Sequence, residues 1–310
     1  MSRHLLFLLT LIAIIAASTS ANAAEINAPF TERDPSRLEL ASVNALVIDA
    51  NTGQVLYAKN PSTVTPIASV TKLMGAMVVL DSDAKMDDIL DIQIRETKEL
   101  TGVFSRVRVD SKLTRKEILQ LSLMSSENRA AASLAHHYPG GTSAFVAAMN
   151  AKAKQLGMNN TQFVEPTGLS EKNLSSAEDL AKMLVAASAY DTINELSTTA
   201  QKDSHFSRPM HTLNFVNTNP LIRYHKWDVK ISKTGFTNAA GHCLVMMTKI
   251  QNREVAMILL DSFGKLSHVG DAARIRQWIE TGHSNQVPAV AKAYEQRKNQ
   301  AKAQSLAVAI

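Results

Sequence analysis

The sequence predicts a mixed α/β protein (α+β), in which strands from both chain ends form one antiparallel five-stranded sheet. Helices flank this sheet, and a helical region is inserted in the middle of the chain. Two observations lead to this fold class. Strand-like segments lie at 43–49 and 54–59 and again at 227–236, 241–250 and 253–262, whereas the intervening pattern is mostly helical. Strands from both ends can share one sheet only if the ends of the domain meet.

Short turns join two of the predicted strand pairs. Segments 43–49 and 54–59 flank Asn51-Thr52-Gly53, and the last two segments flank Gln251-Asn252. Asn and Gly adopt the left-handed backbone conformations of tight turns more readily than other residues do. We therefore expect both pairs to be antiparallel hairpins.

A buried helix is expected to begin at Ser69. Pro66 stands just before it, and the residues from Leu73 to Leu80 carry no charge. A helix that is apolar on all sides belongs in a protein core rather than on a surface. Ser69 would then lie in the first turn of a core helix.

The pattern from about Asp83 to Ala200 predicts helices, and a closing helix is expected over about 266–281. The apolar side of the closing helix would consist of Val269, Ala272, Ala273, Ile275, Trp278 and Ile279. From Pro288 to Ile310 the chain is rich in Ala, Lys and Gln and has no strong apolar stripe. This composition favours a frayed helix over a membrane helix.

The N-terminus has the pattern of a cleaved export signal. Arg3 is the only charged side chain before an apolar run from Leu5 to Ala17, which is too short to span a bilayer. The small-residue site Ala21-Asn22-Ala23 follows, so we expect residues 1–23 to be a signal peptide, with a retained membrane anchor as the alternative. The single cysteine, Cys243, is expected to be a buried strand residue.

Composition argues against several classes of function. The 310 residues are 45% hydrophobic and 20% charged, with a formal net charge of +5. Such a charge would favour approach to an anionic polymer, but no basic run alternates with aromatic residues, so nucleic-acid binding is not expected. Metalloprotease and phosphate-loop motifs are absent from the sequence, and we expect neither a metal nor a cofactor.

Three short stretches fit together as one active site: Ser69-Val70-Thr71-Lys72, Ser126-Glu127-Asn128 and Lys233-Thr234-Gly235. Ser69 and Lys72 are three residues apart, so their side chains share one face of a helix. Burial and a nearby Lys233 would both disfavour the charged form of Lys72, and a neutral lysine can remove the proton of a serine hydroxyl. The first helical turn also offers unpaired N–H groups to a developing oxyanion.

None of these motifs is specific when taken alone. Ser-x-x-Lys recurs at Ser82 and Ser262, and Ser-x-Asn recurs at Ser42. Only the Ser69 copy opens an apolar helix, however, and the second motif lies between two helical runs, as a buried turn would. The third motif occurs once, at the end of a predicted strand. Order, separation and context together make the signal strong.

With these motifs the chain resembles the low-molecular-mass penicillin-binding proteins, which are D-alanyl-D-alanine carboxypeptidases and endopeptidases. Further matching segments lie at 46–57, 66–69, 163–169 and 233–237, and the likeness covers roughly residues 40–283. The resemblance implies a catalytic domain over 24–283, with the helical region 83–200 as an insertion, a C-terminal tail over 284–310, and a periplasmic location.

The resemblance also implies roles in catalysis. Ser69 would be the acyl-ester nucleophile and Lys72 its base. Ser126 would pass a proton to the leaving amine, while Asn128 would position Lys72 and the substrate backbone. The backbone N–H groups of Ser69 and Phe236 would form the oxyanion hole.

The third motif would bind substrate. Lys233 and Thr234, with Thr237 nearby, would hold the carboxylate end, and the Phe236 side chain would wall one side of the cleft. Glu127 departs from the small residue that is common at its position in related enzymes, and its charge would alter how a second peptide strand is received.

The resemblance leaves several functions open. The first expectation is an endopeptidase that cleaves D-alanyl–diaminopimelate cross-links in peptidoglycan, with pentapeptide trimming by a carboxypeptidase as the alternative. A β-lactamase and a non-catalytic penicillin sensor are further candidates. Glu165-Pro166 is similar to the deacylating glutamate of class A β-lactamases, but Thr167-Gly168-Leu169 lacks the asparagine partner. We interpret Glu165 as a loop residue and expect β-lactams to be persistent covalent inhibitors; membrane association would be peripheral at most.

Overall fold

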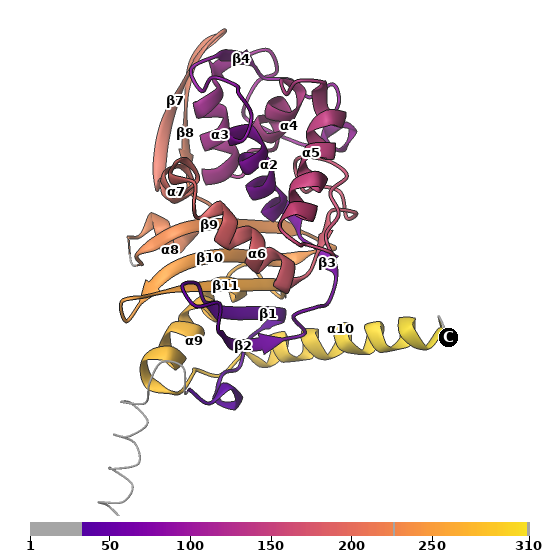
Figure 1. The fold of residues 1–310 in the computed structure, drawn as a ribbon, viewed down its shortest axis with the longest axis vertical. Helices are drawn as coiled ribbons and strands as arrows, with labels where there is room; N and C mark the ends of the chain where they lie inside the picture. Colours follow the sequence, from indigo (N-terminus) through magenta and orange to yellow (C-terminus); the bar gives the residue numbers. More distant parts are fainter. Residues whose placement is uncertain (1–32, 226, 309–310) are drawn as a thin grey trace, which may run out of the picture.

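A computed structural model describes residues 33–225 and 227–308, so the predicted signal peptide lies outside the described part of the chain. Its centre is a five-stranded antiparallel sheet in the order β2-β1-β11-β10-β9 (Figure 1). Two strands come from the N-terminal part, β1 (Ser42–Asp49) and β2 (Val55–Lys59). Three come from the C-terminal part, β9 (Val229–Thr237), β10 (Gly241–Ile250) and β11 (Arg253–Ser262). The predicted fold class is confirmed.

Strands from the two ends of the domain pair directly with each other in the sheet. β1 pairs with β11 in an antiparallel register that sets Ser42 opposite Ser262. The β10–β11 turn is the expected hairpin, since Gln251 and Asn252 have φ values of 47° and 63°. Both values lie in the left-handed region that a two-residue hairpin turn requires.

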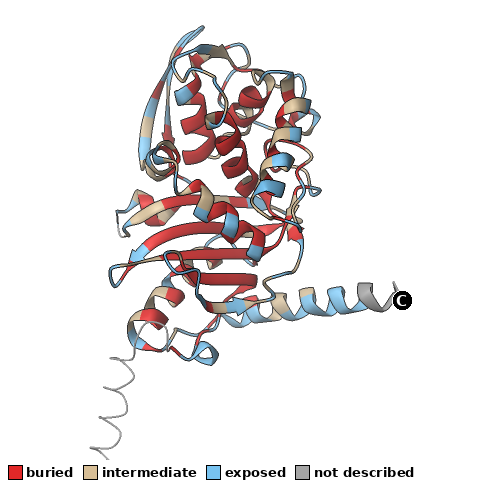
Figure 2. Cartoon of the chain, viewed as in Figure 1, coloured by how far each residue is buried: buried red, intermediate tan, exposed pale blue. Residues whose placement is uncertain are grey.

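Alternate residues of β1 face two separate cores, which is why the whole strand is buried (Figure 2). Leu46 and Ile48 belong to the larger core, which is shared with the helical region. Ala45 and Val47 belong to the smaller core on the opposite face, where α9 (Ser267–Thr281) packs. The apolar side of α9 is as expected except that Ala273 is exposed. A sheet covered on both faces has near-continuous hydrophobic strands.

The helical region surrounds α2 (Thr71–Leu80), whose residues from Thr71 to Val79 are all buried. The helix therefore lies in the core, as the uncharged run from Leu73 to Leu80 predicts. The flanking helices are α3 (Arg115–Met124), α4 (Asn128–His136), α5 (Gly141–Gln155), α6 (Ala177–Ala187) and α7 (Asp191–Thr198). Short elements connect them: β3 (Thr65–Pro66), β4 (Ile89–Asp91), η4 (Lys98–Leu100), β5 (Lys112–Thr114) and β6 (Leu174–Ser175).

A hairpin of β7 (Gln201–Ser207) and β8 (Met210–Val216) runs along the helical region and was not predicted (Figure 1). In β7 only Ser204 and Phe206 are buried. A strand with so little apolar surface gives no clear alternating signal. The short α8 (Pro220–Arg223) leads from this hairpin towards β9.

The C-terminal tail forms α10 (Ala289–Val308), which is tied to the sheet rather than frayed along its first half. The Tyr294 hydroxyl donates to Asp261 Oδ1 at 2.6 Å, and Lys298 Nζ lies 2.8 Å from Asp261 Oδ2. Lys59 of β2 also pairs with Glu295 at 2.7 Å. Within 33–225 and 227–308, no helix is both long enough and apolar enough to cross a bilayer.

Candidate active site

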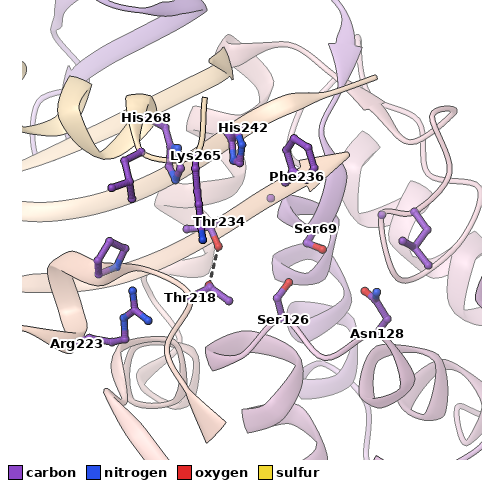
Figure 3. A pocket seen from close by; sticks show the side chains of 15 residues that line it. Ser69, Ser126, Asn128, Thr218, Arg223, Thr234, Phe236, His242, Lys265 and His268 are labelled. Atoms are coloured by element: carbon purple, nitrogen blue, oxygen red, sulfur yellow. Dashed lines mark hydrogen bonds between the residues drawn. The ribbon is translucent and has the colours of Figure 1, made fainter. Parts of the chain in front are cut away.

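The three motifs come together where the helical region meets the sheet. Ser69 lies in the short 3-10 turn η3 (Ala68–Val70), which runs directly into α2 and places Lys72 in its first turn. Ser126 lies in the turn between α3 and α4, Asn128 is the first residue of α4, and Lys233 comes from β9. Figure 3 shows Ser69, Ser126 and Asn128 converging on one cleft. The α-helix starts at Thr71, two residues later than expected, so Ser69 precedes it.

Lys72 is the centre of the hydrogen-bond network. Its Nζ lies 2.7 Å from Ser69 Oγ, 2.8 Å from Asn128 Oδ1 and 2.6 Å from the Thr167 carbonyl oxygen. Burial lowers the pKa of this amine to about 8, although the carboxylates of Glu165 and Glu127 oppose the change. A neutral amine at this distance can accept the proton of the serine hydroxyl.

Lys233 is the second buried amine of the site. Its Nζ donates to Ser126 Oγ at 2.9 Å and to the Thr234 carbonyl oxygen at 2.8 Å. Burial, together with the positive charge of Lys72, holds the pKa of Lys233 well below its ordinary value. Two protonated lysines repel each other because both are positively charged, and the low-dielectric interior strengthens this repulsion. Each serine of the site thus has its own lysine partner.

The turn between α3 and α4 is strained where it carries Ser126, whose φ is 60°. Glu127, next in the chain, caps α4 by accepting from the Arg129 N–H at 3.1 Å, and it also accepts from Ser105 Oγ at 2.9 Å. Strained non-glycine residues concentrate at functional sites. Through its contacts with Arg129 and Ser105, the carboxylate of Glu127 holds the turn that carries Ser126.

Glu165 is buried, and its carboxylate accepts hydrogen bonds from five donors of its own loop. Its carboxylate accepts the N–H groups of Thr167 and Gly168, both at 2.6 Å, and that of Ser170 at 3.2 Å. The Thr167 hydroxyl and the Asn173 amide also donate to it. This carboxylate fixes the loop whose Thr167 carbonyl meets Lys72, as expected of a loop residue.

The β9 backbone passes directly beside Ser69. A Cβ built on Gly235 would lie 3.0 Å from the Ser69 nitrogen, so glycine allows this close approach. Phe236, the next residue, is 55% exposed and stacks on His242 with ring centroids 4.2 Å apart. Phe236 is among the residues that line the cleft.

The cleft has a volume of about 370 Å³ and includes residues that the motifs do not mark. These are Thr218, Pro220, Arg223, His242, Lys265, Leu266 and His268. The hydroxyls of Thr234 and Thr218 are 2.6 Å apart. Thr237 is not part of the lining; its hydroxyl instead accepts from the Ala240 N–H at 3.1 Å. No sequence spacing marks the added residues, because only the fold brings them to the cleft.

A metal centre is not apparent in the described part of the chain. Within residues 33–225 and 227–308, no three His, Cys, Asp or Glu side chains are grouped so that they could hold a metal ion. His136 and His137 instead lie 3.0 and 3.2 Å from Glu96 and Asp91.

Comparison with known sequences finds relatives that are named as D-alanyl-D-alanine peptidases. Residues 29–264 match a family model described as D-alanyl-D-alanine carboxypeptidase. The chain is 56% identical over 263 residues to the D-alanyl-D-alanine endopeptidase of Escherichia coli (strain K12), covering 85% of both chains. It is 53% identical over 292 residues to the D-alanyl-D-alanine endopeptidase of Pseudomonas aeruginosa, covering 94% of both chains.

Solved structures share the fold. The Streptomyces K15 DD-transpeptidase is similar with a TM-score of 0.72 and 26% identity, over 78% of this chain and 97% of that one. Penicillin-binding protein D2 of Listeria monocytogenes, solved in its ampicillin-bound form, is similar with a TM-score of 0.67 and 26% identity, over 79% and 98% of the two chains.

Proposed function

Because this chain belongs to the D-alanyl-D-alanine carboxypeptidase family of serine DD-peptidases (peptidase S11), we propose that it is an endopeptidase that hydrolyses D-alanyl–diaminopimelate cross-links in peptidoglycan. The supporting observation in the structure is the 2.7 Å contact between Lys72 Nζ and Ser69 Oγ inside the cleft. The choice of endopeptidase rests on two relatives more than half identical to this chain, and on its resemblance to penicillin-binding protein 7.

Acylation begins at Ser69. Its Oγ attacks the carbonyl carbon of the D-alanine residue while Lys72 takes the hydroxyl proton. The N–H groups of Ser69 and Phe236 stabilise the resulting oxyanion. When the carbon–nitrogen bond breaks, the proton returns through Ser126 to the leaving amine, and an ester to Ser69 remains. Water then hydrolyses this ester, which frees the enzyme and a D-alanine carboxylate.

The other motif residues hold the substrate. Asn128 keeps Lys72 in place through its 2.8 Å contact and has its amide group available to the substrate backbone. Lys233 and Thr234 bind the carboxylate beside the scissile amide, since a buried cation and a hydroxyl together suit an anion. Thr237 supports the end of β9 beside this position.

β-Lactams act as covalent inhibitors in this proposal. They acylate Ser69, and the ester persists because Glu165, already engaged by five donors of its own loop, is not available as a base for water. Residues 1–23 direct the chain to the periplasm, where its polymeric substrate lies. Contact with the membrane is peripheral at most.

Two incubations of the purified protein test the proposal. With cross-linked muropeptide dimers, dimer loss and monomer release support it, whereas trimming of pentapeptides alone indicates a carboxypeptidase. With labelled penicillin, a long-lived ester fits a peptidase, rapid release of hydrolysed product indicates a β-lactamase, and labelling without any digestion indicates a sensor. Ser69→Ala should abolish both labelling and digestion while the protein still folds.

A further inference from the structure

The cleft extends beyond the candidate nucleophile into a region that carries two cations. Arg223, at the end of α8, and Lys265, in the loop after β11, line the same cleft as Ser69. In Figure 3 Arg223 lies on the side of Thr218 away from Ser69, and the Lys265 side chain extends towards Thr234. Among the described residues that line the cleft there is no Asp or Glu. This end of the cleft is therefore positively charged.

Arg223 carries a buried donor that lacks a protein partner. Its Nε is buried without a hydrogen bond to any described residue, and its guanidinium lies 5.7 Å from the centre of the exposed Tyr224 ring. Buried donors in native proteins are nearly always paired, so an unpaired one in a cleft points to a ligand. His268, which lines the same end, has a buried Nδ1 that is likewise unpaired among the described residues.

Two further amines are buried where the cleft meets Ser69 and Ser126. Lys72 and Lys233 are both buried, and the hydroxyls of Thr218 and Thr234 are in contact with each other. Burial lowers the pKa of His268 to about 4, so its imidazole is neutral at neutral pH and can donate or accept one hydrogen bond. The combination of cations and hydroxyls without a carboxylate favours an anionic ligand.

We propose that Arg223 and Lys265 form a second anion subsite, which binds the far carboxylate of the leaving diaminopimelate residue. This inference rests on the proposed endopeptidase function. A leaving D-alanine has one carboxylate, next to its amine, and Lys233 with Thr234 already holds that group in the proposed function. Diaminopimelate has the same carboxylate and another at the opposite end of its carbon chain. Where diaminopimelate ends its stem peptide, that second carboxylate is free.

The placement of the subsite matches the direction in which the leaving group departs. Ser126 delivers the proton to the leaving amine, and Lys233 links the Ser126 hydroxyl to the Thr234 carbonyl oxygen. The leaving residue therefore extends from Ser126 towards Thr234 and Thr218. Arg223 lies farther along the same line, and the Lys265 side chain reaches this path at Thr234 (Figure 3). A guanidinium can hold a carboxylate through two parallel hydrogen bonds, which gives specificity as well as affinity. The subsite therefore favours cross-links whose acceptor stem ends in diaminopimelate over terminal D-alanine.

Matched substrates and variants test this selection. The substrates are a dimer whose acceptor stem ends in diaminopimelate and the same dimer with that end carboxyl amidated. We expect the wild-type protein to prefer the free acid by about tenfold or more in kcat/KM, as the loss of a charge-assisted hydrogen bond implies. The double variant Arg223→Gln/Lys265→Gln should lose this preference, and Lys249→Gln, which removes an exposed cation of β10, should retain it.

A binding readout keeps the test independent of turnover. A tripeptide ending in diaminopimelate should slow the acylation of the wild-type protein by labelled penicillin, and the double variant should need about tenfold more tripeptide for the same effect. If the wild-type and double variant respond alike to both dimers and to the tripeptide, the subsite does not exist. If no dimer is cleaved by the wild-type protein, the endopeptidase proposal fails, while the tripeptide experiment still decides whether the subsite binds its carboxylate.

Discussion

Gly168 packs against the backbone of Ala68 so closely that a Cβ built on Gly168 would lie 2.0 Å from the Ala68 carbonyl oxygen. Gly168 also has a φ of +83°, which side chains disfavour. The loop that contains Thr167 and the turn that precedes the candidate nucleophile are therefore in direct backbone contact. This contact sets the distance at which the Thr167 carbonyl meets Lys72.

Gly168→Ala should separate the loop from the turn. We expect penicillin acylation to fall by tenfold or more, because small displacements of reacting groups cost about 10²-fold, and the free energy of unfolding to fall by more than about 2 kcal/mol. Gly157→Ala is the matched control, since Gly157 has a φ of +68° but a Cβ there would meet nothing within 4 Å. The control should lose about 1 kcal/mol and keep its acylation rate. Equal behaviour of the two variants would contradict the steric explanation.

Acylation by penicillin should accelerate as pH rises through about 8, the value to which burial lowers the pKa of Lys72. Only the neutral amine can accept the Ser69 proton, so below this pH the rate should fall about tenfold per pH unit. Labelling rates from mildly acidic to alkaline pH measure the profile. Lys72→Met should slow acylation by about 10²-fold or more. A flat profile would mean that another group is the base.

Lys72 should destabilise the folded protein at neutral pH. Its pKa is about 8 when folded against an ordinary value of 10.5, so the unfolded chain binds the proton more strongly. The destabilisation is complete below about pH 8 and disappears as pH rises towards 10.5. We expect Lys72→Met to raise the free energy of unfolding at neutral pH by about 1 kcal/mol or more. Urea unfolding should show this gain shrinking in alkaline buffer, and Ser69→Ala should show no such pH-dependent gain.

Glu165→Gln should weaken the loop without changing ester hydrolysis. The N–H groups of Thr167 and Gly168 donate to different oxygens of the carboxylate, so the NH2 group of glutamine would face one of these two donors, and an unpaired buried donor costs about 1–3 kcal/mol. We therefore expect a lower melting temperature and a slower acylation by penicillin. The lifetime of the penicilloyl ester should stay within a few-fold of the wild-type value. A far longer lifetime in the variant would identify Glu165 as a deacylating base instead.

The attachment of α10 should contribute to stability through Asp261. This carboxylate is buried, and Tyr294 and Lys298 of α10 supply its partners. Removing both partners in Tyr294→Phe/Lys298→Met leaves a buried charge unpaired, which should cost about 3 kcal/mol. Lys302→Met, farther along α10 at an exposed position, is the control and should change the free energy of unfolding by less than about 0.5 kcal/mol. Equal unfolding curves for both variants would show that α10 adds nothing to the domain.

Much of the fold could be predicted from local patterns. The inner strands β1, β10 and β11 have long apolar runs because both faces of the sheet are covered there. The observed bounds of the five strands differ from the expected ones by two residues at most. The β7–β8 hairpin could not be predicted because its exposed strands carry polar residues at most positions. The attachment of α10 was missed for a different reason, since its main partner, Asp261, is distant in sequence.

The residues of the site likewise include some that sequence spacing could predict and others that only the packing of the fold brings to the cleft. Ser69 and Lys72 are neighbours on one helical turn, so their 2.7 Å contact follows from spacing. Arg223 and Lys265 reach the cleft only through the packing of α8 and of the loop after β11, and no motif spacing records that packing. The role of Thr167 was likewise invisible, because it acts through a backbone carbonyl that any residue possesses.

The pairing of β1 with β11 also constrains how the polypeptide comes to fold. The hydroxyls of Ser42 and Ser262 lie 2.7 Å apart although 220 residues separate them. β1 can pair with β2 early, but its other neighbour, β11, is absent until nearly all of the chain has been made. Such high contact order slows closure of the sheet. In the proposed export, this delay leaves the chain extended for passage through a translocation channel.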